Sequence, residues 1–160
     1  MYLRIVSTLV LLLNFYLIQG QSIIQYFNKV ALYKVLASGN LEEINIELKL
    51  LSNVALPEKQ AYEGTLLMKK AGMVAKPVEK LRWFKAGRIK LEEAIIKDSL
   101  NSEYRFLRLL IQEHAPKIVK YRSSLADDSK NIESNFTSLS SLLQQVIKEY
   151  SKRSGILKIA

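Results

Sequence analysis

The sequence contains no cysteine, one histidine, six glycines and three prolines in 160 residues. Without cysteine the chain can form no disulfide, thiolate metal site or cysteine nucleophile. Its single histidine, His114, excludes a conventional histidine-rich metal cluster. Glycine and proline are also the main turn signals, and apolar residues repeat at spacings of three and four. Both observations predict long helices rather than many short strands.

Catalytic motifs are missing as well: the sequence has no G-x-S-x-G, no G-x-x-x-x-G-K and no H-E-x-x-H. The adjacent carboxylates at 42–43, 92–93 and 127–128 diverge by about 100° on a helix, so they indicate solvated faces rather than acid–base dyads. His114 is expected to pack near the end of a helix, and Glu113 to form a structural ion pair. We predict that the protein is not an enzyme and uses no cofactor or metal.

Charge is abundant and mostly positive, with a net charge of +9. Lysine and arginine are spread along the chain, and the densest groups are pairs such as Lys69-Lys70 and Lys152-Arg153. Dispersed charge of this kind predicts a solvated basic surface rather than a specific nucleic-acid site.

The N-terminus has the plan of a secretory signal peptide. Arg4 is the only charge before an apolar run from Ile5 to Ile18, which a polar stretch follows. A spanning helix needs about 20 apolar residues, so a stable membrane anchor is not expected after cleavage. We predict a signal peptide at 1–20, cleaved at 20/21 or 22/23. Residues 21–160 would then form one all-helical domain in the periplasm or outside the cell.

Caps and apolar stripes divide that domain into six or seven helices. The first ends at Gly39, Asn40 caps the second, and Pro77 begins the fourth. The predicted ranges are 23–38, 41–51, 61–71, 77–98, 102–115, 125–137 and 139–153, and the tail at 155–160 is expected to fray.

The fifth predicted helix, 102–115, has an apolar arc of about 220° and should be the most buried. Its expected solvent stripe is Arg105, Arg108 and Gln112. Two guanidinium groups one turn apart could clamp a carboxylate or phosphate of a partner. They could equally be the solvent edge of a core helix, paired with Glu92, Glu93 or Asp98.

Two stretches resemble tetratricopeptide repeats. One is Ala37-Ser38-Gly39-Asn40-Leu41-Glu42-Glu43-Ile44, which is similar to the turn between the two helices of such a repeat. The other is the spacing of Gly87, Leu91, Ala94 and Ser99, which is similar to its second helix. The resemblance implies stacked antiparallel hairpins that a C-terminal helix caps. The distance from Gly64 to Gly87 is about eleven residues too long for the consensus period.

The chain also resembles small exported bacterial proteins with a helix of the Glu-Tyr-Arg-Phe-Leu-Arg type, which implies export and helicity but no activity. We therefore expect a scaffold or adaptor that binds an unknown protein or peptide. One alternative is a ligand carrier or enzyme with an anion pocket near Arg105, Arg108 and His114. Another is a structural component of the cell envelope. A closed cavity with convergent arginine and histidine side chains would favour a ligand, and a shallow groove would favour the scaffold.

Overall fold

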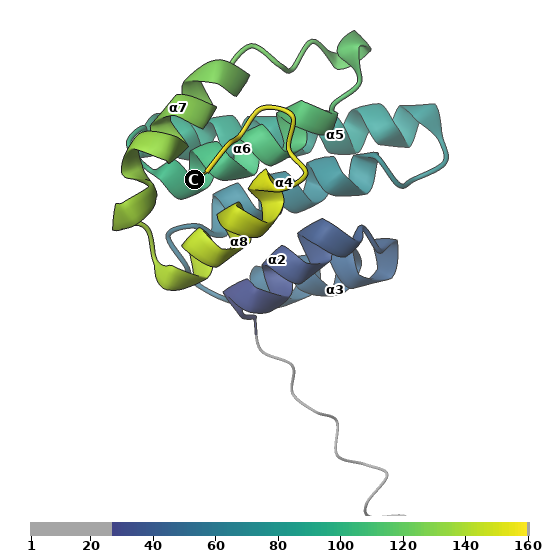
Figure 1. Ribbon diagram of the computed structural model, residues 1–160. Coiled ribbons are helices and arrows are strands. Elements are labelled where there is room, and N and C mark those ends of the chain that lie inside the picture. The colour runs from purple at the N-terminus through teal and green to yellow at the C-terminus, as the bar shows by residue number, and fades with distance from the viewer. Residues whose placement is uncertain (1–26, 160) are drawn as a thin grey trace, which may run out of the picture.

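The computed structural model describes residues 27–159 (Figure 1). Within that range the chain forms seven α-helices, two short 3₁₀-helices and no strand, which confirms the predicted all-α fold. The predicted signal peptide and both cleavage positions lie outside the described residues. No helix between residues 27 and 159 is long and apolar enough to span a membrane.

The first hairpin consists of α2 (Lys29–Ser38) and α3 (Leu41–Ser52). Gly39 ends α2 in the left-handed region, at φ +70°, where a residue without a Cβ is favoured. The Asn40 side chain then accepts hydrogen bonds from the backbone N–H groups of Glu42 and Glu43. These contacts confirm the predicted cap and explain why two helices can be joined by only two residues.

The next hairpin consists of α4 (Lys59–Ala71) and α5 (Pro77–Lys97), which make the most extensive helix–helix contact in the described part of the chain. Gly64 and Gly87 face each other where the two helices cross. A Cβ added to Gly64 would lie 2.7 Å from both the Gly87 carbonyl oxygen and the Leu91 backbone nitrogen. Glycine at both positions therefore allows the backbones of α4 and α5 to touch. The first hairpin, α2 and α3, packs against α4.

Helix α6 (Ser102–His114) runs through the centre of the molecule, in contact with α4, α5 and α7. Asn101 caps it through hydrogen bonds from the backbone N–H groups of Glu103 and Tyr104. The prediction that this helix is the most buried is confirmed, since nine of its residues are buried. Even the polar residues Arg108 and Gln112 of α6 are buried.

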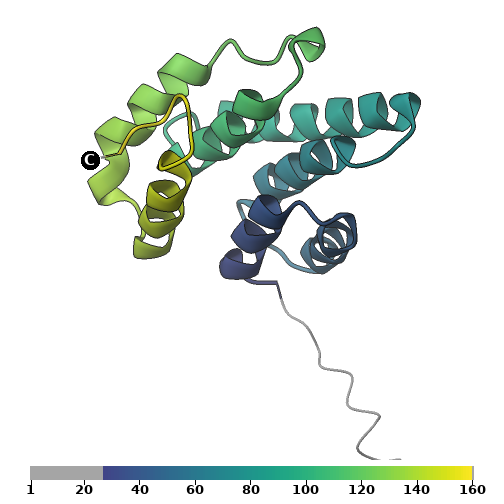
Figure 2. The ribbon, with the colours of Figure 1, turned by 45° about the vertical axis from the view of Figure 1, so that its right-hand side comes forward.

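The C-terminal part of the chain covers α6 (Figures 1 and 2). It contains a 3₁₀-helix at Lys117–Val119, α7 (Leu125–Asn135), a second 3₁₀-helix at Phe136–Ser138, and α8 (Ser141–Ser151), which Ser140 caps. The tail was expected to fray, and this is wrong for its first residues. Leu157 is fully buried, and the backbone N–H of Gly155 donates to Glu113.

Candidate functional site

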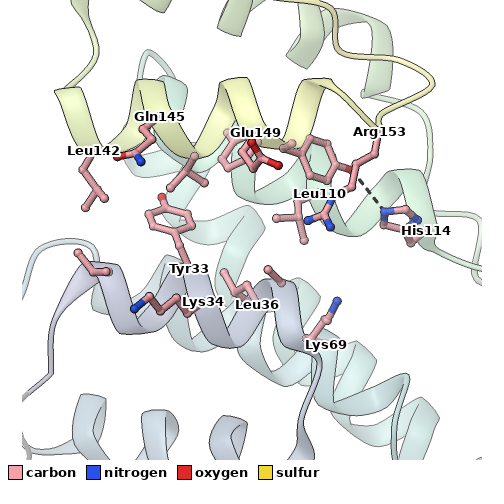
Figure 3. Close-up of a pocket in the computed structure, with 15 residues that line it drawn as sticks. Tyr33, Lys34, Leu36, Lys69, Leu110, His114, Leu142, Gln145, Glu149 and Arg153 are labelled. Carbon is pink, nitrogen blue, oxygen red and sulfur yellow. Dashed lines mark hydrogen bonds between the residues drawn. The ribbon is translucent and has the colours of Figure 1, made fainter.

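A hollow of about 460 Å³ lies between α2 and α8, with α6 beneath it (Figure 3). It is a groove rather than a closed cavity, because many of its lining side chains are exposed; Val30, for example, keeps 46% of its surface. The lining residues are Val30, Tyr33, Lys34, Leu36, Ala37, Lys69, Phe106, Leu110, His114, Leu142, Gln145, Val146, Glu149, Tyr150 and Arg153.

Each wall of the groove is one stripe of a helix. Residues 30, 33, 34 and 37 of α2 follow one another at helical spacing, and so do residues 142, 145, 146 and 149 of α8. Residues three and four apart lie on the same helix face, so both stripes point into the groove. The sequence pattern of α8 could not indicate that α2 would face it.

Aromatic and aliphatic side chains of the core form the floor. The Phe106 ring packs edge-on against Tyr150, with centroids 5.6 Å apart, and lies 6.3 Å from the ring of Tyr33. Leu110 continues this surface toward the end of α6 (Figure 3). The groove therefore opens onto buried, ordered apolar side chains, which a partner's side chains could contact.

Two carboxylates of α6, Glu103 and Glu113, hydrogen-bond to the helices that form the two walls of the groove, α2 and α8. Glu103 accepts hydrogen bonds from the Tyr33 hydroxyl of α2 and the Tyr62 hydroxyl of α4, each at 2.8 Å, and also pairs with Lys29. Burial and then the nearby Glu103 charge raise the pKa of Tyr33. Its hydroxyl therefore stays protonated and keeps donating. The wall formed by α2 is held by a charge-assisted bond rather than by apolar packing alone.

Glu113 holds the other wall. It accepts from the Tyr150 hydroxyl of α8 at 2.6 Å, from the Ser154 hydroxyl at 2.7 Å and from the Gly155 backbone at 2.6 Å. Burial alone would raise the pKa of Glu113, but these hydrogen bonds lower it. The sequence predicted an ion pair for Glu113, and this is wrong: its strong contacts are hydroxyl and backbone donors.

His114 lines one end of the groove, near the C-terminus of α6. Its ring lies edge-on to Tyr150, and its Nε2 atom is 3.5 Å from the Tyr150 hydroxyl. The predicted place near a helix end is right, but His114 is exposed and contacts Tyr150 on one side only, so the predicted packing is partial. Within residues 27–159 no group of three or more histidine, aspartate or glutamate side chains could hold a metal ion.

The predicted solvent stripe of α6 does not lie in the groove and is not exposed. Arg108 is 8% exposed and Gln112 1% exposed, because α7 covers this side of α6. Asp128 of α7 is fully buried and accepts two hydrogen bonds from Arg108, both at 2.7 Å. Arg105 binds the same carboxylate at 3.2 Å. The predictions that the stripe is solvated and that Asp128 is solvated are both wrong.

A second carboxylate completes this cluster. Arg108 also binds Glu92 of α5 at 2.8 Å, as one of the sequence alternatives expected, and Tyr121 donates to Glu92. Burial alone would lower the pKa of Arg108, but Asp128 and Glu92 raise it above its ordinary value. Asp128 and Glu92 thus occupy the hydrogen-bond donors of the Arg108 guanidinium group. Arg108 and Arg105 therefore fasten α7 to α5 and α6, and His114 lines a different part of the molecule.

Comparisons with known proteins identified no relative of this chain. No family model matches the chain, and no curated protein and no solved structure matches it. The groove therefore has to be interpreted from its own chemistry.

Proposed function

We propose that the protein is an exported, non-catalytic helical adaptor that binds an apolar segment of a partner protein in the groove between α2 and α8. The observation that carries this proposal is an open groove of about 460 Å³ whose floor consists of core side chains. Apolar grooves between helices are a common way to bind an amphipathic helix. The two walls, each hydrogen-bonded to α6, would be ordered before binding, which reduces its entropic cost.

The mode of binding follows from the absence of strands in residues 27–159. An extended peptide gains affinity by pairing its backbone with an exposed strand, and here there is no such strand to pair with. A helix satisfies its own backbone hydrogen bonds and can present one apolar face to the groove. We therefore assign a helical segment of the partner to the groove.

Two antiparallel hairpins with short turns support the tetratricopeptide resemblance. The contact of Gly64 with Gly87 supports it too, because small residues at helix crossings are part of that repeat's pattern. The export prediction rests on the N-terminal sequence, and N-terminal sequencing of the exported fraction tests it. Chains that begin at residue 21 or 23 would support cleavage, and chains that still begin at Met1 would contradict it.

A matched pair of alanine substitutions tests the groove. Ala37 lines the groove and is exposed, while Ala126 is exposed on α7 and lies outside it. Peptides would be selected from a displayed library against the purified protein, and their binding measured by fluorescence anisotropy. We expect Ala37→Trp to weaken binding at least about tenfold by filling the groove, and Ala126→Trp to leave it unchanged. Equal affinities for the two variants would place the binding site elsewhere and contradict the proposal.

A carrier of small apolar acids is the second candidate, because about 460 Å³ lies within the usual range of ligand pockets. Dodecanoate is a suitable probe, since it combines an apolar chain with a carboxylate. If dodecanoate binds in a way that Ala37→Trp abolishes, and no peptide is selected, the protein is a carrier and the adaptor proposal fails.

A further inference from the structure

One end of the groove is positively charged. Lys69 of α4, Arg153 just beyond α8 and His114 at the end of α6 line this end together (Figure 3). Apolar and uncharged side chains, including Leu142 and Gln145, dominate the other end of the α8 wall. Lys34 of α2 is the one cation of the lining on that side, so positive charge is denser at the end that Lys69 and Arg153 line.

Lys69 and Arg153 form no salt bridge within the described part of the chain, although Lys152 and then Arg153 lower the pKa of Glu149. Neither Lys69 nor Arg153 has a carboxylate oxygen within 4 Å; Arg153 lies over the Tyr150 ring instead, 5.8 Å from its centroid. Glu149, the one carboxylate in the lining, is bound to Lys152 at 2.6 Å. Burial and then the charge of Arg153 lower the pKa of Lys69, so the two positive charges repel each other.

Helix ends do not account for this pair of charges. The C-termini of α2, α6 and α8 lie near this end of the groove, and each carries about half a negative charge at most. In the last turn of each helix one carbonyl group, that of Val35, Gln112 or Tyr150, accepts a hydrogen bond from a backbone N–H group. Such partial charges are shielded within one turn, whereas Lys69 and Arg153 carry full charges. Lys69 and Arg153 therefore leave more positive than negative charge at this end of the groove, where Glu149 is the one carboxylate of the lining.

We infer that the partner helix carries acidic side chains at the end that meets Lys69 and Arg153. This inference rests on the proposed function, because it concerns the occupant of the same groove. The apolar face of the helix would lie on Phe106 and Leu110, and its carboxylates would neutralise two cations that otherwise repel each other. Burial of the lysine makes this neutralisation stronger than at an open surface.

The test compares peptide selections against four forms of the protein. They are the unaltered protein, Lys69→Met/Arg153→Met, Arg122→Met/Lys130→Met, and Ala37→Trp. Arg122 and Lys130 are exposed and lie outside the groove. Both double variants lower the net charge by two, so they separate a local effect from a general one. Methionine keeps most of the apolar stem of each side chain, and circular dichroism verifies that each variant folds.

The unaltered protein should select helices with Asp or Glu enriched at one end. It should bind such a peptide about tenfold more tightly than a version with Lys at those positions. The Lys69/Arg153 variant should lose this preference, and the Arg122/Lys130 variant should keep it. If apolar helices are selected without acidic enrichment, and Ala37→Trp blocks them, the acidic inference is overturned while the adaptor proposal stands. If the groove variant changes nothing, both fail.

Discussion

Replacing Asp128 with asparagine tests how α7 is held on the rest of the molecule. Asp128 has no exposed surface, and its two oxygens accept hydrogen bonds from Nε and Nη2 of Arg108, each at 2.7 Å. Arg105 adds a third contact at 3.2 Å. The amide keeps the volume of the side chain but removes its charge and one acceptor oxygen. The perturbation is therefore electrostatic and leaves no cavity.

The magnitude follows from the burial of this cluster. Breaking a buried ion pair costs about 3–5 kcal/mol, because the remaining charge loses its partner in a poorly solvated site. Arg108 keeps its contact with Glu92, and the asparagine oxygen still accepts one hydrogen bond. We therefore expect the lower end of the range, about 3 kcal/mol. For a domain of this size that corresponds to a melting temperature lower by about 10 °C.

Urea unfolding followed by circular dichroism at 222 nm measures this loss, with Asp127→Asn as the control. Asp127 is the exposed neighbour of Asp128, so its substitution should change the free energy of unfolding by less than about 0.5 kcal/mol. Hydrogen exchange should show faster opening of α7 in Asp128→Asn alone. Equal stabilities of the two variants would refute the conclusion that this carboxylate holds α7 in place.

Two further predictions concern other contacts of the core. Gly64→Ala should destabilise the protein by about 1–3 kcal/mol or more in the same assay, because its Cβ would press on the backbone of α5 at Gly87. The control is Gly72→Ala, where a Cβ has more space, and it should cost less than about 0.5 kcal/mol. Similar losses of stability at both sites would contradict the close crossing of α4 and α5. Glu113→Gln should destabilise most at neutral pH. The lowered pKa of Glu113 contributes stability above its unfolded pKa of about 4.3, and this contribution is lost as the pH falls through the folded pKa. The difference from the unaltered protein, measured by urea unfolding between pH 7 and pH 3, should shrink toward low pH; a constant difference would mean that the charge of Glu113 does not stabilise the fold.

Local signals were enough to place most helices. Asn40 caps α3 and Pro77 begins α5 as the sequence predicted, and Asn101 caps α6 directly before its predicted start. Each of these signals depends on neighbouring backbone groups only, so tertiary structure has little influence on it. The last two helices were predicted too long, because a 3₁₀-helix at Phe136–Ser138 and Ser140 separate them.

The burial of Arg108 and Gln112, and the partial burial of Arg105, could not be predicted in the same way. A helical pattern shows which side of α6 is polar, but not whether another helix covers that side. The covering helix, α7, brings Asp128 from 20 residues further along the chain. Burying an arginine costs much free energy unless a carboxylate pairs with it. Such a pair between distant residues does not appear in the periodicity of the sequence.

The sequence by itself determined that the chain is helical, where most helices begin and end, and that it can form no disulfide or thiolate site. Caps, apolar spacing and the absence of cysteine carry that information because they act over one or two turns. Only the tertiary structure decided which faces lie in the core and which face the groove. The groove needs α2 and α8, whose lining residues Val30 and Val146 are more than a hundred positions apart in the sequence. Glu103 and Glu113 hold these helices by hydrogen bonds that exist only in the folded chain.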